Sequence, residues 1–477
     1  MEEKKEYVTP LTGRYASKEM KELWSAHKKY TTWRKLWVAL AETERELGLA
    51  ISQEQIDEMK ENIEHIDYNV VDKREKECKH DVMAHVYAFG ENCPKAKPII
   101  HLGATSCYVT DNTDILLIKE GLLLIRKKLL QVVFFLRNFA NEKKDLVCLG
   151  YTHFQPAQLT TMGKRATLWM QDLLEDLQEL DFTIEHLKLL GCKGTTGTQE
   201  SFMKLLGEEE KVKQMDEKIA GKMGMKKIFA VSGQTYTRKV DTRVLNVLSQ
   251  IAQSACKFAT DLRLLQHEKE LEEPFEKNQI GSSAMAYKRN PMRSERICSL
   301  ARHVMTLTND ANMTASTQWL ERTLDDSANR RISLPESFLA TDAILLLYGN
   351  IVQNIVVYPN VIKKHIDQEL PFMATEEILM KAVLKGGDRQ DLHERIRKHS
   401  MEAAKQVKIE GKENDLVLRI AKDEAFAMTK EEIEKAMIPE HLCGRAVHQV
   451  EDFIKIVDEI LDKNRESLSD KEIEINV

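Results

Sequence analysis

Apolar residues recur at helical spacing over several unusually long stretches of this chain. Between Ser17 and Leu49, tryptophans and leucines return every three or four positions, and Gly48 marks the expected end of that helix. Longer patterns cover residues 111–143, 158–190, 239–271 and 327–357. Helices of about 30 residues are about 45 Å long and pack best side by side, so the pattern predicts an all-α fold built on a long-helix bundle.

The first of these long helices has polar capping residues at its expected start and apolar residues over much of its circumference. Asp111, Asn112 and Thr113 offer the caps, and Ile115 and Phe134 are among the apolar positions. Helices that are apolar all round must be buried, and one chain cannot cover all of them. We therefore predict self-association through the long helices, with twofold-related pairs stacked into a homotetramer whose core is the bundle.

Shorter helical patterns precede and follow the long ones. After Pro359 the pattern is broken repeatedly by proline and glycine, for example at Pro371 and Gly411. This change predicts three domains, which cover residues 1–105 (N-terminal helical domain), 106–358 (central long-helix bundle) and 359–477 (C-terminal helical domain). The charged segment 463–477 is predicted to be poorly ordered.

Composition narrows the class of protein. The eight cysteines include no CxxC pair and no zinc-like spacing, which favours reduced thiols in a cytoplasmic protein. A net charge of −6 argues against a general nucleic-acid binder, although it leaves room for a local basic pocket. No apolar run approaches the roughly 20 residues needed to span a bilayer, so we expect no membrane association. The charged N-terminus lacks the apolar segment of a secretory signal.

Residues 279–296, which read QIGSSAMAYKRNPMRSER, combine features that a packed helix avoids. Gly281 frees the backbone, two serines follow, and a basic run precedes a new helical pattern. Successive backbone N–H groups, a helix N-terminus and a lysine suit an oxyanion or a carboxylate that gains charge during a reaction. On composition alone, a solvated basic loop without chemistry fits equally well.

Histidines are the natural candidates for proton transfer near neutral pH. His153 stands in YTHFQPAQ, on an expected loop before a long helix, which favours a functional role. His80 and His85 are five residues apart, so about 140° separates them on a helix and they cannot share a metal ion. His101 precedes a small-residue loop, LGATS. For His80 and His101 the local sequence fits a structural and a functional role equally well.

Cations and hydroxyls offer a possible phosphate site. Arg322 and Arg331 flank Ser327, an arrangement that suits a phosphate held by guanidinium groups and a hydroxyl, although the signal is weak alone. The chain has no phosphate-binding GxxxxGK[ST] loop, no nucleophile elbow GxSxG and no metal-ligand cluster. Acid–base elimination is therefore a good candidate, because it needs only a base, an acid and an anion site.

Several motifs in the same order resemble the adenylosuccinate lyases of the fumarase/aspartase superfamily. They are KHDVMAH, HLGATS, THFQPAQ, KGTTGT, SGQTYTRKVD, GSSAMAYKRNP and ERTLDDSANRR. The resemblance implies an all-helical homotetramer in which three subunits build each active site, without a metal or organic cofactor. It also implies release of fumarate from adenylosuccinate, leaving AMP, and from the succinylated aminoimidazole carboxamide ribotide (SAICAR), leaving AICAR.

The resemblance implies a role for individual residues. Ser282 would be the base, His153 the acid oriented by Glu295, and Lys288 and Asn290 would hold the carboxylate whose charge rises. The residues implied at the nucleotide end are Arg14, Tyr15, Arg322, Ser327 and Arg331. Those implied to complete the pocket are Lys79, His80, Asp81, Thr105, Ser106, Gln234 and Arg296, with His101 in support.

The chain departs from the family pattern at two positions. Ala286 replaces a proline in the motif GSSAMAYKRNP (residues 281–291), which we call the signature loop, and this leaves the open loop more freedom. Lys79 replaces an arginine and loses its bidentate fork. Two alternatives stay open, namely another fumarate-releasing lyase of the argininosuccinate type, or a catalytically silent helical scaffold.

Overall fold

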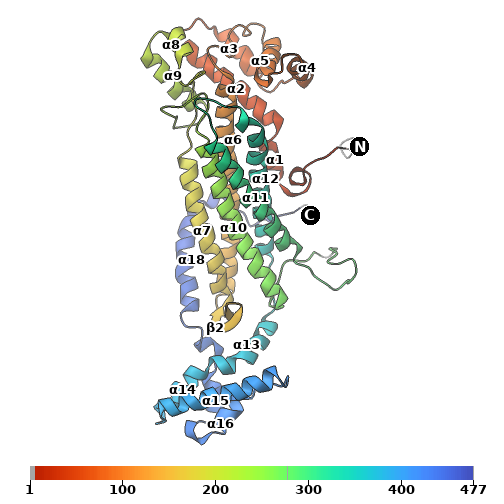
Figure 1. Ribbon diagram of the computed structural model, residues 1–477, viewed down its shortest axis with the longest axis vertical. Coiled ribbons are helices and arrows are strands. Elements are labelled where there is room, and N and C mark those ends of the chain that lie inside the picture. Colours follow the sequence, from red (N-terminus) through yellow and green to blue (C-terminus); the bar gives the residue numbers. More distant parts are fainter. Residues whose placement is uncertain (1–5, 277, 476–477) are drawn as a thin grey trace.

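The computed structural model describes residues 6–276 and 278–475, and its long helices run side by side through the middle of an elongated molecule (Figure 1). Helices formed by residues 26–92 lie at one end, and short helices formed by residues 359–436 lie at the other. The predicted all-α fold is confirmed, apart from two short antiparallel strand pairs.

Serine caps divide the N-terminal segment into separate helices. The hydroxyls of Ser17 and Ser25 accept hydrogen bonds from the backbone N–H groups of Met20 and Lys28, so the pattern predicted as one helix is split at Ser25. Trp33, Trp37 and other apolar side chains form a core of their own here. The elements are η2 Leu11–Tyr15, α1 Lys18–Leu23, α2 Ala26–Glu46, α3 Gln53–Glu61, α4 Tyr68–Cys78 and α5 Asp81–Asn92, joined later by α8 Glu200–Leu206 and α9 Glu209–Lys222.

In the described part of the chain, five long helices form the bundle. They are α6 Ser106–Glu142, α7 Met162–Glu185, α10 Lys239–His267, α11 Met292–Ser316 and α12 Asp325–Gln353. The predicted caps of α6 were wrong, because the helix starts at Ser106 and places Asp111 and Asn112 inside it. Both side chains are buried, where Asp111 binds Arg238 and Asn112 binds the backbone of Gly191. Their polarity serves tertiary contacts rather than the helix end.

A β-hairpin stands where a helix start was predicted. Strands β1 Val147–Thr152 and β2 Gln155–Thr161 pair antiparallel, and α7 begins only at Met162 rather than near Gln158. The second pair, β3 Leu271–Glu272 and β4 Val356–Val357, joins the chain after α10 to the chain after α12. Helices α6 and α12 both begin at one end of the bundle, which we call the cavity end because a cavity described below lies there. The opposite end, with β1 and β2, is called the hairpin end.

The C-terminal helices build a third apolar core, and the chain then returns to the bundle. The elements are α13 Pro359–Met373, α14 Thr375–Leu384, α15 Arg389–Lys408, α16 Leu416–Ala421, η3 Glu424–Phe426, α17 Lys430–Ala436, η4 Pro439–His441, α18 Ala446–Asp462 and η5 Arg465–Ser467. Helix α18 packs against α6 and α7. We propose the three-domain division, in which α18 belongs to the C-terminal segment by sequence but packs in the central bundle.

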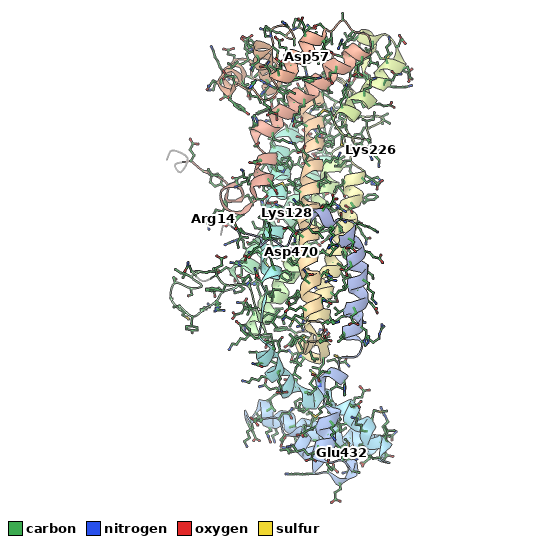
Figure 2. All side chains as sticks on the ribbon, turned by 180° about the vertical axis from the view of Figure 1, so that it is seen from behind. Arg14, Asp57, Lys128, Lys226, Glu432 and Asp470 are labelled. Carbon is green, nitrogen blue, oxygen red and sulfur yellow. The ribbon has the colours of Figure 1, made fainter. Side chains whose placement is uncertain are left out.

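The predicted disorder of the C-terminal segment was wrong for its described residues. Gln131 of α6 exchanges two hydrogen bonds with the backbone of Ser469, and Asn350 of α12 donates to the carbonyl of Ile473. These contacts hold residues 469–473 along the bundle, near its middle (Figure 2). The last two residues of the predicted segment, 476 and 477, lie outside the described part of the chain.

Helix α12 is long and apolar enough to cross a membrane by length and composition. However, 78% of its most apolar window is buried inside the protein. Its burial against α6, α10 and α11 identifies it as a core helix of the bundle.

Glu44 of α2 is a buried carboxyl group without a partner. It is fully buried, and neither of its oxygens has a hydrogen-bond partner among the described residues. Burial raises its pKa from 4.5 to about 8. The folded protein therefore keeps a proton between pH 4.5 and about 8 that the unfolded chain releases. The free energy of unfolding falls as pH rises through this window.

We expect Glu44→Gln to raise the melting temperature at pH 8 and to change it much less at pH 5, because the glutamine carries no charge to bury. Thermal unfolding at the two pH values measures this. The control is Glu42→Gln on the same helix, since Lys60 and Lys222 lower the pKa of Glu42 against the opposing effect of burial. That variant should not gain stability at pH 8. An equal shift for Glu44→Gln at both pH values would contradict the argument.

Candidate functional site

A cavity of about 1020 Å³ lies at the cavity end of the bundle, under the N-terminal helices. Its wall is made by segments that are far apart in the chain, from α2, α5, the start of α6, the segment before α10 and the start of α12. The sequence-predicted residues that line it are Lys79, His80, Asp81, His101, Thr105, Ser106, Gln234, Arg322, Ser327 and Arg331. The structure thus brings together most of the residues predicted to bind substrate.

The starts of α5, α6 and α12 lie at this cavity. His80 caps α5 by accepting the backbone N–H of Met83, Thr105 precedes α6, and Ser327 lies in the first turn of α12. All three residues line the cavity. A helix N-terminus carries a partial positive charge and unpaired N–H groups, so three of them favour a bound anion.

Buried ion pairs fix the deep wall. Arg238 donates to Asp111 at 2.9 Å and to Asp326 at 2.6 Å, and all three side chains are buried. Arg322 donates to the second oxygen of Asp326 at 2.9 Å. Although burial opposes it, the guanidinium groups of Arg238 and Arg322 hold the pKa of Asp326 below its usual value. The carboxylate therefore stays charged and orients Arg322 at the cavity.

Two neighbouring arginines of α12 have different surroundings. Arg330 is buried and donates to Asp241 at 2.6 Å and to Asp114 at 2.9 Å. Arg331 is 54% exposed at its side chain and donates to Asp81 at 2.8 Å. Arg330 is thus part of the framework, whereas Arg331 presents its guanidinium to the open part of the cavity.

His101 has a defined tautomer. The indole N–H of Trp37 donates to Nδ1 of His101 at 2.9 Å, so Nδ1 carries no proton. Burial, with a smaller effect of His80, lowers the pKa of His101 to about 4. His101 is therefore neutral at pH 7 with its proton on Nε2. It lines the cavity as a hydrogen-bond donor and not as an acid. His85 instead lies in the core, packed against Tyr30 with the ring centroids 3.8 Å apart and the rings tilted by 31°.

The signature loop lies away from the cavity. The Oγ of Ser282 accepts hydrogen bonds from the backbone N–H groups of Ala284 at 3.3 Å and Met285 at 3.1 Å. Asn290 closes the base of the loop by donating to the carbonyl of Gly281 at 2.7 Å. A Cβ at position 281 would come within 2.1 Å of the carbonyl oxygen of Lys288, so only glycine fits there. The side chain of Lys288 is exposed.

Arg14 and Tyr15 lie near the start of α11, which follows this loop. The guanidinium of Arg296 is 5.3 Å from the ring centroid of Tyr15, and that of Arg14 is 5.9 Å from the same ring. Arg14 lies beside the middle of the bundle, on the side from which the loop projects (Figures 1 and 2). Glu295, in the first turn of α11, is exposed.

His153 occupies the turn of the β1–β2 hairpin. Thr152 pairs with Gln155, so His153 and Phe154 form a two-residue turn, and both have positive φ angles, 53° and 56°. Two positive angles match the type I′ turn, which usually contains asparagine and glycine. A non-glycine residue held in this conformation is strained and is often functional. The imidazole of His153 is exposed.

One chain holds three groups of predicted residues apart. Helix α6, with 37 residues, separates the cavity from the hairpin by about 55 Å. Helix α11, with 25 residues, separates the cavity from the signature loop by about 38 Å. The loop projects sideways, while the hairpin lies at the bundle end (Figure 1). Ser282, His153 and the cavity therefore do not meet within a single chain.

The structure adds cavity residues that the sequence did not indicate. Lys29 and Tyr30 of α2 and Asp114 of α6 line the cavity. Burial lowers the pKa of Lys29, and the charge of Asp114 opposes this effect. These residues lie within ordinary amphipathic patterns, so no local signal sets them apart. Arg238 could have been found from the sequence, because it lies in the family motif SGQTYTRKVD.

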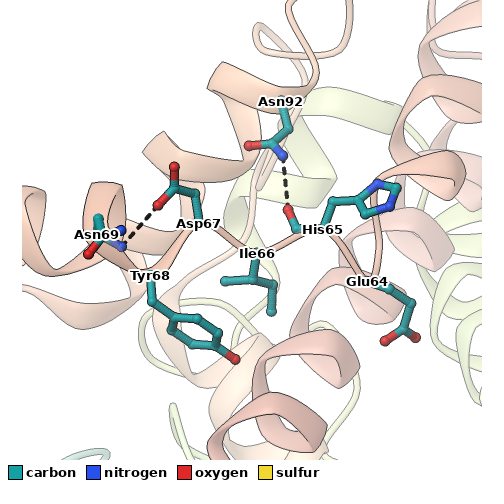
Figure 3. Close-up of a pocket in the computed structure, with 7 residues that line it drawn as sticks. All are labelled: Glu64, His65, Ile66, Asp67, Tyr68, Asn69 and Asn92. Carbon is teal, nitrogen blue, oxygen red and sulfur yellow. Dashed lines mark hydrogen bonds between the residues drawn. The ribbon is translucent and has the colours of Figure 1, made fainter.

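A second, shallower depression of about 630 Å³ is lined by residues 64–69 and Asn92 (Figure 3). Its polar atoms serve the fold. Asn92 donates to the carbonyl of His65, and Asp67 caps α4 by accepting the N–H groups of Asn69 and Val70. None of the predicted site residues lines it. Within the described part of the chain, no group of three or more histidine, cysteine or acidic side chains is placed to hold a metal ion.

Comparison with known proteins assigns the chain to a family. Residues 5–306 match the family described as lyase, and residues 371–453 match the one described as adenylosuccinate lyase C-terminus. An adenylosuccinate lyase of Saccharomyces cerevisiae is 53% identical over 476 residues, which cover 99% of each chain. The chain belongs to the adenylosuccinate lyase family.

Further comparisons agree with this adenylosuccinate lyase assignment. An adenylosuccinate lyase of Schistosoma mansoni is 49% identical over 457 residues, 95% of each chain. A 3-carboxy-cis,cis-muconate lactonizing enzyme from Pseudomonas putida has a TM-score of 0.82 at 20% identity, covering 94% of this chain and 98% of that one. This likeness shows that the two chains share a fold. The predicted resemblance is confirmed, and the chain is a lyase.

We expect Arg330→Ala to destabilise the protein by about 3–5 kcal/mol, because it removes the cation paired with the buried carboxylate of Asp241 and with the partly buried carboxylate of Asp114. Arg331→Ala should change stability by no more than about 1 kcal/mol, since its ion pair is exposed, and should instead raise KM. Denaturant unfolding and steady-state kinetics measure the two effects. Equal losses of stability in both variants would contradict the division into framework and binding residues.

Proposed function

We propose that this member of the family splits adenylosuccinate into AMP and fumarate, and SAICAR into AICAR and fumarate, in purine nucleotide biosynthesis. The observation that carries the proposal is the cavity of about 1020 Å³ at which α5, α6 and α12 begin and arginines are held in place by buried carboxylates. Its size and the helix N-termini at its wall suit a nucleoside monophosphate. Family membership supplies the reaction class.

The nucleotide end of the substrate is proposed to bind in this cavity. Arg322, Ser327 and Arg331 would hold the phosphate together with the N-terminus of α12. Lys79, His80, Asp81, Thr105, Ser106 and Gln234 would complete the wall, with neutral His101 as a hydrogen-bond donor. Arg14, Tyr15 and Arg296 are proposed to reach the same substrate from another copy of the chain. No metal or organic cofactor is part of the proposed reaction.

Ser282 is proposed as the base. Hydrogen bonds that reach its Oγ from the N–H groups of Ala284 and Met285 favour the alkoxide, since they stabilise the charged form. The alkoxide takes the proton from the carbon beside a succinyl carboxylate, and the electron pair enters a carbanion-like intermediate. Lys288 and Asn290 would hold the carboxylate whose charge rises in that step.

His153 is proposed as the acid. The intermediate collapses by forming the double bond of fumarate and breaking the C–N bond, while the imidazolium of His153 protonates the departing nitrogen. Glu295 would orient the ring. Because His153, Ser282 and the cavity lie in three separate places of one chain, we propose a homotetramer in which three subunits build each site. The eight free thiols support a reducing compartment, and we place the enzyme in the cytoplasm.

We expect the purified protein to release fumarate from adenylosuccinate, and Ser282→Ala to lower kcat by about 10²–10⁴-fold while substrate still binds. Fumarate absorbance and calorimetric titration measure turnover and affinity. Ser283→Ala is the matched control and should retain turnover, because the hydroxyl of Ser283 takes no part in the proposed reaction. Normal turnover of Ser282→Ala would refute the base. No fumarate release by the unchanged protein would instead favour a silent helical scaffold.

The shared site can be tested by mixing two inactive variants. Ser282→Ala and His153→Gln proteins, dissociated and reassembled together, should regain fumarate release, because some sites then combine a native serine from one chain with a native histidine from another. Each variant treated alone is the control and should stay inactive. A mixture that forms mixed tetramers by native mass spectrometry, yet stays inactive, would show that one chain supplies both residues.

A further inference from the structure

Glu270 is a buried carboxylate at the base of the hairpin that carries His153. It is fully buried just after α10. The hydroxyl of Tyr151 donates to its Oε1 at 3.2 Å, and Nδ1 of His365 lies 3.0 Å from the same oxygen. Its Oε2 has no hydrogen-bond partner among the described residues. A buried carboxylate is costly for stability, so its presence here points to another role.

The three side chains belong to three different parts of the fold. Tyr151 is in β1, two residues before His153, Glu270 precedes β3, and His365 is in α13. The backbone N–H of Tyr358 also donates to the carbonyl of Glu270 at 2.9 Å, and Leu271 pairs with Val357. Glu270 therefore ties the hairpin to the end of the bundle and to the first C-terminal helix.

The hairpin bends at Tyr151. Its register shifts between Gly150 and Tyr151, and such an irregularity re-aims the residues that follow it. Beyond this point, residues 152–158 are exposed, so the bundle does not pack around the turn. The direction of the His153 imidazole therefore depends on how Tyr151 is fixed at the base.

We propose that Glu270 is a positioning residue for His153, acting through the hydroxyl of Tyr151 and held from the other side by His365. This inference rests on the proposed role of His153 as the acid. Burial, reinforced by the charge of Glu270, raises the pKa of Tyr151, so the phenol stays protonated and donates throughout the neutral range. Losing this bond leaves the imidazole less well aligned with the departing nitrogen, and proton transfer slows.

Neighbouring carboxylates determine which variant is the cleanest test. Glu272 pairs with Arg289 of the signature loop at 3.2 Å, and Glu273 accepts the backbone N–H groups of Arg293 and Ser294 at 3.0 Å. Truncating Glu270 could shift these contacts as well. Tyr151→Phe keeps the ring in place and removes only the hydroxyl.

In the full-length enzyme, Tyr151→Phe is expected to lower kcat for adenylosuccinate by about 10–100-fold, because a small misplacement of a reacting group is enough for such a loss. KM should change little, since Tyr151 is not among the residues that line the cavity proposed to bind the nucleotide. Glu270→Gln keeps an oxygen for Tyr151 and His365 and should retain most of the turnover, whereas Glu270→Ala should not. The control is Tyr348→Phe, whose buried hydroxyl has no hydrogen-bond partner among the described residues. It should keep wild-type kcat.

The outcomes separate this inference from the proposed function. If His153→Gln loses turnover but Tyr151→Phe keeps it, the positioning role is wrong and the proposed acid stands. If Tyr151→Phe lowers the melting temperature and raises KM without changing kcat, the bond is a structural tie only, and the inference fails. If His153→Gln itself retains turnover, the proposed acid and the inference both fail.

Discussion

The length and stiffness of the long helices determine where each functional group of this chain lies. Helix α6 is one continuous helix about 55 Å long, and it packs against α7, α12 and α18 in the bundle. The cavity lies where α6 begins and His153 lies beyond its end. In the proposed reaction, a nucleotide site and a proton donor held so far apart can act together only across a chain boundary. The proposed sharing of each active site between chains is then a consequence of the length of the helices.

Charge is arranged differently at the two ends of the bundle. At the cavity end, Arg238 and Arg330 are paired with buried aspartates, while Arg322 and Arg331 extend from the same framework towards open space. At the hairpin end, the acidic residues of the segment 270–273 bind groups from the hairpin, the signature loop and the start of α11. The first arrangement suits the recognition of an anion. The second fixes the segments proposed to transfer protons.

The helical bundle could be predicted from the sequence because proline and glycine are rare and apolar residues recur over 30 positions. The start of α6 could not, since Asp111 and Asn112 look like caps but bind partners 127 and 79 positions away, respectively. The hairpin was missed because its turn uses histidine and phenylalanine rather than asparagine and glycine. Local motifs located most of the cavity, whereas Lys29 and Asp114 join it only through tertiary packing.

The two-residue turn at His153 and Phe154 also limits how this part of the chain can vary. In a hairpin, side chains alternate between the two faces, so one inserted or deleted residue would reverse the orientation of every position beyond it. Homologues can therefore be expected to differ here by substitution and to keep the same length. Changes of length are better tolerated at exposed turns such as that of Gly411, where an added Cβ would meet no neighbouring atom within 4 Å.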